Sequence, residues 1–172
     1  LRNHGFEGSP ALYVQGDLWA IPERLLITPG VRADYLTGYE GVYVQPRLMT
    51  RFRVQGEWWL KGGIGLFHMY QQAPYSDAVL GNPKLRAEQA WHFTVGLEAR
   101  PLPFYRALKL ELNLFYKDLR NLAVSSDVNT QRDGKIVPER YSDEGIGRVY
   151  GGDLLLKIDN GHRLYGWISY TL

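Results

Sequence analysis

The residue types that most often bind metals are present in this sequence but are not grouped. The four histidines, which lie on separate segments, are His4, His68, His92 and His162. A metal site needs two or three ligands brought together, commonly at i, i+2 or i, i+4 spacing, and these histidines have no such spacing. Cysteine is absent, which excludes thiolate metal sites and disulfide scaffolds. We therefore predict no metal site.

Patterns typical of catalysis or cofactor binding are equally weak. Glycines spaced G-x-G-x-x-x-G begin at Gly145, whereas a dinucleotide fingerprint is G-x-G-x-x-G between a strand and a helix. No helix is expected there, so strand bulges or close backbone approach explain these glycines better. Carboxylates occur near one predicted loop at Asp118, Asp143 and Glu144, without a Ser-His-Asp or Gly-x-Ser-x-Gly arrangement. We expect no enzymatic activity and no cofactor.

Composition narrows the class of protein further. The 172 residues include 20 basic and 18 acidic side chains, and this near balance gives no electrostatic case for nucleic acid binding. The mean hydropathy is −0.30, and the sequence has no apolar run of the about 20 residues that a membrane-spanning helix needs. Yet it contains 12 Tyr, 5 Trp and 19 Gly. This combination is typical of strands that are apolar on one face and polar on the other.

The dominant pattern is an alternation of period two, which predicts β-strands in eight segments. It is clearest in residues 108–114, where leucines alternate with Lys109, Glu111 and Asn113. The other segments begin at Leu12 and Leu26 or span residues 42–54, 58–72, 91–100, 149–158 and 162–172. They are about 10 to 15 residues long, which is longer than the usual strands of soluble sheets. A tilted strand of this length can cross a bilayer. Pro29 and Pro46 lack a donor for the sheet, so they suggest strand ends or bulges.

Short and longer connections alternate between these segments. The short ones are residues 22–24, 55–57, 101–106 and 159–161, and the longer ones are 37–41, 73–87 and 127–148. Outer-membrane barrels have short periplasmic turns and longer extracellular loops. The first segment is therefore expected to run towards the periplasm and the last to run outward. We interpret residues 1–172 as one domain, an antiparallel transmembrane β-barrel segment.

Three arginines mark one face of the segment 42–54, namely Arg47, Arg51 and Arg53. A charge that faces lipid at the bilayer midplane costs about 2–4 kcal/mol, so in a barrel these side chains must be lumen-facing. In a soluble sheet they would lie on a solvated face.

The two longest connections supply the candidate contacts for an external ligand. They are Tyr75, Asp77 and Arg86 in the first loop, and Arg132, Arg140 and Tyr141 in the second. The alternative is a generic surface loop. Aromatic residues near strand ends, including Trp91, Tyr116 and Tyr150, are typical of the girdles at membrane interfaces, with a carbohydrate-stacking platform as the alternative.

Several motifs resemble, in their order and spacing, those of the TonB-dependent receptor family. GNPKLRAE at residues 81–88 runs into WHFTVGLE at 91–98, and FYKDLRNL follows at 115–122. GIGRVYG at 145–151 precedes DLLL at 153–156, while YVQGD, TPGVR and PRL begin at Tyr13, Thr28 and Pro46. Asp153 and Ala87 depart from the Glu and Pro that are common in the family, and neither change disturbs a strand.

The resemblance implies about eight strands from the C-terminal part of a barrel of about 22 strands, which encloses a plug. Such a protein lies in the outer membrane of Gram-negative bacteria and imports a scarce nutrient, such as a ferric siderophore. Its implied partners are outer-membrane lipid, the extracellular nutrient ligand and the TonB system. Contact with TonB would go through a plug domain absent from this chain, and the lumen-facing arginines would meet water or an acidic plug surface.

Two other classes fit the alternation. A small closed eight-stranded outer-membrane barrel, acting as an anchor or adhesin, predicts that the first and last strands pair with each other. A soluble ligand-binding barrel predicts that the apolar side chains are enclosed. The receptor class predicts unpaired strands at both edges of the sheet.

Overall fold

The computed structural model describes residues 10–36, 41–72, 75–77, 81–100, 108–132, 134–159 and 165–172. The strands are β1 (Ala11–Gln15), β2 (Leu18–Ile21), β3 (Leu25–Leu36), β4 (Gly41–Gln55), β5 (Trp58–Met69), β6 (Glu88–Ala99), β7 (Leu108–Arg132), β8 (Lys135–Asp159) and β9 (Tyr165–Thr171). None of the described segments forms a helix that is long and apolar enough to cross a membrane.

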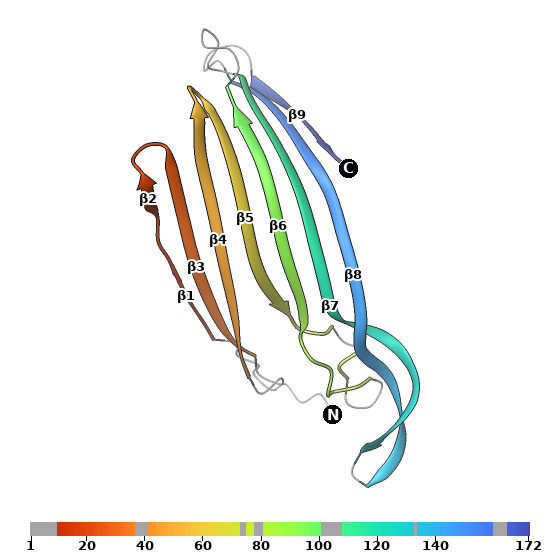
Figure 1. Cartoon of the computed structure of the whole chain (residues 1–172). Coiled ribbons are helices and arrows are strands. Elements are labelled where there is room, and N and C mark those ends of the chain that lie inside the picture. The colour runs from red at the N-terminus through yellow and green to blue at the C-terminus, as the bar shows by residue number, and fades with distance from the viewer. Residues whose placement is uncertain are drawn as a thin grey trace.

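The strands form one antiparallel sheet in which neighbours in sequence are neighbours in space (Figure 1). The order is β1-β3-β4-β5-β6-β7-β8-β9, and β2 also pairs with β3. Because β1 and β2 follow each other along the same partner strand, the sheet has eight strand positions. The eight predicted segments are therefore confirmed, with the first one split in two.

The split lies beside a proline. Pro29 and Pro46 both lie within strands, in an uninterrupted β3–β4 register that pairs Pro29 with Leu48 and Val31 with Pro46. The expectation that they mark ends or bulges of their own strands is wrong. Instead, Gly16 lies in the gap between β1 and β2, and its N–H donates to the Pro29 carbonyl at 3.2 Å. Pro29 has no N–H to donate in return, so the ladder of backbone hydrogen bonds is interrupted in the neighbouring strand.

The register sorts side chains into two faces, because directly paired residues of antiparallel strands point to the same side. Leu112 pairs with Leu97 and Leu154, whereas Asn113 pairs with Gly96 and Asp153. The apolar face exposes Leu12, Val14, Val31, Val44, Leu48, Leu60, Ile64, Val95, Leu112, Leu114, Leu154 and Ile168. The polar face carries Arg32, Gln45, Arg47, Arg51, Lys61, Thr94, Glu98, Lys109, Glu111, Asn113, Lys117 and Asp153.

Few apolar side chains are enclosed by protein. Among the described residues, the buried hydrophobic side chains are Leu85, Ala87 and Ala99. A soluble barrel would need its apolar face covered, so this surface contradicts the soluble alternative. In the described part of the chain β9 does not pair with β1 or β2, and these strands form opposite edges of the sheet. That arrangement contradicts the small closed barrel.

The predicted loop at residues 127–148 is wrong. β7 and β8 are each 25 residues long, and their pairing extends from Leu108 with Ile158 to Arg132 with Lys135. The far part of this hairpin projects beyond the other strands (Figure 1). Its register shifts lie past Leu119, and Asn121 and Arg140 have positive φ angles of 57° and 67°. These irregularities bend the hairpin where it leaves the sheet.

The connections gather by length at the two ends of the sheet. The described residues between β5 and β6, which are 70–72, 75–77 and 81–87, lie with the hairpin tip at one end, hereafter the loop end. The tight turns after β2 and β4 lie at the other end, the turn end (Figure 1). Glu23 and Gly56, each with φ 55°, complete these two turns. The predicted short connection 101–106 and most of 159–161 lie outside the described residues, as do residues 37–40 of the first longer connection.

A pair of substitutions on adjacent β7 residues tests the two faces. Leu112→Arg places a charge on the apolar face and is expected to destabilise the barrel in lipid by about 2–4 kcal/mol. Asn113→Arg adds the same charge to the polar face and is expected to cost less than about 1 kcal/mol. Urea unfolding of the full protein in lipid vesicles measures both. Equal losses from the two variants would contradict the assignment of the faces.

Candidate functional sites on the polar face and at the loop end

The three predicted lumen-facing arginines share the polar face of β4. The register pairs Arg47 with Gly65, Arg51 with Lys61 and Arg53 with Trp59. Arg51 and Arg53 lie near the turn end, whereas Arg47 lies further towards the loop end. The structure therefore divides this set between two sites.

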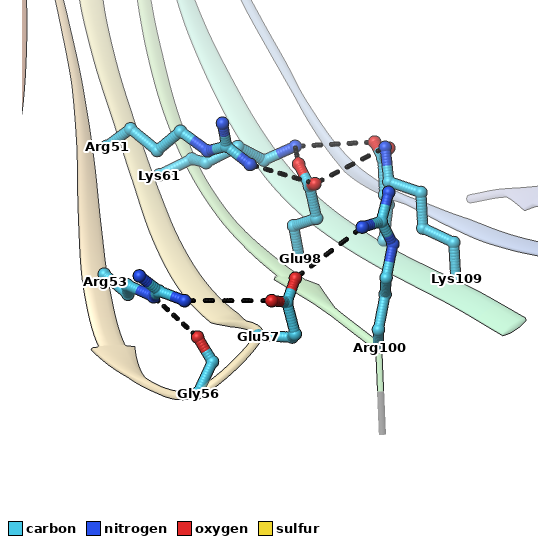
Figure 2. Close-up of polar contacts among 9 residues, drawn as sticks. Arg51, Arg53, Gly56, Glu57, Lys61, Glu98, Arg100 and Lys109 are labelled. Atoms are coloured by element: carbon cyan, nitrogen blue, oxygen red, sulfur yellow. Dashed lines mark hydrogen bonds and ion pairs between the residues drawn. The ribbon is translucent and has the colours of Figure 1, made fainter. Parts of the chain in front are cut away.

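The first site is a charge cluster near the turn end (Figure 2). Its centre is Glu98, whose side chain is 16% exposed and meets three cations. Arg51 Nη2 lies 3.1 Å from Glu98 Oε1, Lys61 Nζ 3.4 Å from Oε2, and Lys109 Nζ 3.5 Å from Oε1. Glu111 contacts Lys109 and also lies 3.4 Å from Lys61 Nζ. The side chains come from β4, β5, β6 and β7, so the cluster crosslinks four strands.

A third carboxylate extends the cluster to the turn itself. Glu57 lies 3.7 Å from Arg53 and 3.6 Å from Arg100 (Figure 2). The Arg53 Nε donates to the Gly56 carbonyl at 2.7 Å, and the Arg51 guanidinium lies 4.2 Å from the centre of the Trp59 ring. Across the whole cluster five cationic side chains share three carboxylates. The cluster therefore carries a surplus of two positive charges.

The second site is a cavity of about 460 Å³ towards the loop end. It is lined by Arg32, Asp34, Gln45, Arg47, Phe67, His68, Met69 and Tyr70. Arg32 pairs with Asp34 at 2.7 Å, and Arg47 Nη2 donates to Gln15 at 2.9 Å. The buried Arg47 Nε has no hydrogen-bond partner among the described residues. Sequence reasoning found only Arg47, although the alternation of β3 and β4 also placed Arg32 and Gln45 on this face.

The structure brings together two of the predicted ligand contacts, Tyr75 and Tyr141. Their rings meet edge to face, with centroids 5.0 Å apart. Asn82 fixes both segments, because its Nδ2 donates to the Tyr141 carbonyl at 2.8 Å and its backbone N–H donates to the Tyr75 carbonyl at 2.7 Å. The segment before β6 is thereby joined to the projecting part of β8.

Arg86 belongs to the same junction. Its Nε and backbone N–H donate to Asp143 Oδ2 at 2.9 and 2.8 Å, and its Nη2 donates to Oδ1 at 3.2 Å. These hydrogen bonds lower the pKa of Asp143 below its usual range, because they stabilise the carboxylate. We call Tyr75, Asn82, Arg86, Tyr141 and Asp143 the clasp. Arg86 is one of the predicted ligand contacts, and in the structure its guanidinium group is hydrogen-bonded to Asp143.

Buried amides support the clasp from below. Gln71 is 3% exposed, and its Nε2 donates to the carbonyls of Arg86 at 3.2 Å and of Asn121 at 2.6 Å. Asn121 in turn donates to the Ala87 carbonyl at 3.1 Å. Ala87 and Leu85 are buried beside these bonds. Sequence reasoning missed Gln71, Asn82 and Asn121, because amides that hydrogen-bond to backbone carry no recognisable spacing.

The other three predicted ligand contacts are Asp77, Arg132 and Arg140. Asp77 is exposed, and its carbonyl accepts from Gly81 N–H at 2.9 Å. Arg140 is exposed on β8, opposite Ser126. Arg132 ends β7, and its side chain lies outside the described residues. No group of three potential metal ligands occurs within the ranges that the structure describes.

An open sheet with one exposed apolar face and one charged face is typical of the wall of a membrane barrel. The sequence profile of the family described as TonB dependent receptor-like, beta-barrel matches residues 2–172. The chain belongs to this family, and its eight strand positions are a portion of a larger barrel. No curated protein sequence matches it significantly.

Solved receptors share the fold at low sequence identity. The siderophore receptor PirA from Pseudomonas aeruginosa has 20% identity and a TM-score of 0.69, covering 95% of this chain and 34% of its own. A variant of the ferric enterobactin receptor PfeA from the same organism has 19% identity and a TM-score of 0.73, covering 95% and 26%. The alcaligin receptor FauA from Bordetella pertussis has 18% identity and a TM-score of 0.69, covering 95% and 29%. The chain thus spans about a third or less of these receptors.

Removal of the central carboxylate of the charge cluster is expected to weaken the barrel. Glu98→Gln leaves Arg51, Lys61 and Lys109 facing one another with less compensation, which costs on the order of 1–2 kcal/mol. High salt is expected to recover part of the loss by screening the cations. Thermal unfolding of the receptor in detergent, at low and high salt, measures this. Glu139→Gln on the projecting hairpin is the control, and a loss independent of salt would contradict the electrostatic explanation.

The clasp is expected to open in acid. Since Asp143 has a lowered pKa in the folded protein, its contribution is complete above the unfolded value of about 3.9 and is lost as the pH falls through the folded pKa. At pH 7, Asp143→Asn is expected to speed amide hydrogen exchange of residues 82–87 severalfold. Asp127→Asn, which changes an exposed carboxylate of the same hairpin, is the control. Unchanged exchange in Asp143→Asn would refute the clasp.

Proposed function

We propose that this chain forms part of the wall of a TonB-dependent outer-membrane receptor that imports a ferric siderophore or a similar scarce nutrient. The observation that carries the proposal is the fold match to several siderophore receptors over 95% of the chain. The low sequence identity does not indicate which ligand is bound. The proposed chemistry of the ligand therefore rests on the residues of the polar face. The role is transport and not catalysis.

The charge cluster near the turn end is the proposed contact for a plug domain. The polar face of β4 to β7 lines the lumen, so Arg51 and Arg53 face inward. The surplus of two positive charges suits an acidic surface of the plug, which is supplied outside these residues. Energy from the TonB system reaches the receptor through that plug.

The cavity around Arg47 is the proposed ligand contact at the loop end. Arg32 and Arg47 present guanidinium groups beside the aromatic side chains of Phe67 and Tyr70. Guanidinium groups bind carboxylate and other anionic oxygens through paired hydrogen bonds, and aromatic rings pack against flat ligands. This chemistry suits an anionic iron chelate. Tyr75, Asp77, Arg132, Arg140 and Tyr141 are further proposed ligand contacts, and Arg86 holds the clasp together.

Loss of the gene that encodes this chain tests the transport role. An in-frame deletion is expected to abolish uptake of radioactive iron from at least one chelate among ferric enterobactin, ferric alcaligin and other siderophores, under iron limitation. Unchanged uptake of every chelate would contradict the proposal.

Substitution of Arg47 tests the proposed ligand contact. Arg47→Gln is expected to weaken binding of the transported chelate about tenfold, because a charge-assisted hydrogen bond is lost. The control is Lys157→Gln, which removes a cation from the polar face at the opposite end. Intrinsic fluorescence titration of the purified receptor measures both affinities. Equal affinity of Arg47→Gln and the wild-type receptor would exclude Arg47 from the site.

A further inference from the structure

A group of charged residues lies on the apolar face of β7 and β8, opposite the face that carries the charge cluster and the cavity around Arg47. It surrounds a cavity of about 500 Å³ that is lined by Asp118, Arg120, Ile146, Gly147 and Arg148. Asp118 pairs directly with Arg148 in the register, and Trp91 pairs with Asp118. These side chains therefore point to the same side as the leucines of β7, away from the polar face.

An aromatic row fixes the depth of this site in the membrane. The row next to it, on the side of the turn end, consists of Phe93, Tyr116 and Tyr150 across β6, β7 and β8. Trp91 stacks on Phe93 with centroids 6.4 Å apart, and Phe93 lies 6.2 Å from Tyr116. Tyr150 is 78% exposed. Amphipathic rings in such a band sit at the level of the lipid headgroups.

The length of the apolar band supports the same depth. From Tyr116 to the start of β7 at Leu108, every second residue of this face is apolar. A tilted strand of about 9–11 residues crosses the bilayer, so these residues span it. The charged group then lies just outside the hydrocarbon, on the side of the loop end.

The group presents an unbalanced positive charge. Arg120 Nε donates to Asp118 Oδ2 at 2.9 Å, which orients the guanidinium and leaves its other N–H groups available. The Arg120 and Asp118 side chains are 62% and 25% exposed. Arg148 is exposed and has no ion pair in the part of the chain that the structure describes. Two guanidinium groups and one carboxylate thus leave a surplus of one positive charge at the membrane surface.

We propose that Arg120 and Arg148 bind the phosphate group of a lipid headgroup in the leaflet at the loop end. Guanidinium groups match phosphate oxygens in geometry, and the exposed Ile146 lies beside them for the apolar part of the headgroup region. A lipid headgroup is favoured over a free anion because the aromatic row places the site at the height of the headgroups. The site rests on the barrel fold and does not depend on which nutrient is imported.

Lipid binding to the purified full receptor tests this site. The probe is lipid A with both phosphates, added to the delipidated receptor in detergent, and native mass spectrometry measures the bound fraction. Each of Arg120→Gln and Arg148→Gln is expected to weaken binding about fivefold, and the double variant roughly 25-fold. The matched control is Lys117→Gln, which removes a cation at the same height from the opposite face and is expected to change binding less than about twofold.

Two further measurements identify the source of the phosphate and separate this proposal from the transport role. Dephosphorylated lipid A is expected to bind the wild-type receptor as weakly as the double variant binds lipid A, and millimolar inorganic phosphate is expected not to compete. Equal binding by the wild type and the double variant would overturn the proposal, as would full competition by inorganic phosphate. Folding of each variant is checked by heat-modifiable migration in gels. Chelate uptake by the double variant is expected to equal that of the wild type.

Discussion

Inside a bilayer no water is available to hydrogen-bond a backbone N–H or C=O group, so each strand must be paired continuously with its neighbours. The ladders meet this constraint in the spanning part of the sheet. β5 pairs with β6 and β6 with β7 without a register shift. The shifts among the described strands lie near the turns, at Trp19 and Arg53, or past Leu119 in the projecting hairpin. The gap at Gly16 and Asp17 is bridged on the polar face, where Thr28 donates to Asp17 at 2.6 Å.

Continuous pairing also decides where charge can reside. Once one face meets lipid, the charged side chains of the spanning strands are confined to the other face and must interact with one another there. This explains why Glu98 meets cations from three other strands, and why Arg32 and Asp34 pair within one strand. On the apolar face, the charged residues Asp118, Arg120 and Arg148 accordingly lie past the aromatic row. The proposed plug contact, ligand cavity and lipid site follow from this division.

The sequence predicted the spanning strands well because lipid on one side and water on the other imposes an alternation that residues 108–114 display directly. The sequence did not predict the strands in residues 127–148, because this alternation arises only where the two faces of a strand meet different surroundings. Both faces of the projecting hairpin meet water, so its 25-residue strands need no apolar alternation and resemble a loop. The clasp was also beyond prediction, since Arg86 and Asp143 are 57 residues apart and meet only through the register of three strands. Of the candidate ligand contacts, the sequence found Tyr75 and Tyr141 but gave no reason for them to touch.

The central claim is that alternate residues of the spanning strands face lipid and a polar interior. Spin labels placed one at a time at residues 109–114 of the full receptor in bilayers test it most directly, through their accessibility to oxygen and to a water-soluble nickel complex. Labels at Leu110, Leu112 and Leu114 are predicted to be accessible to oxygen, which concentrates in the hydrocarbon. Labels at Glu111 and Asn113 are predicted to be shielded from oxygen. An accessibility profile without a period of two would contradict the account.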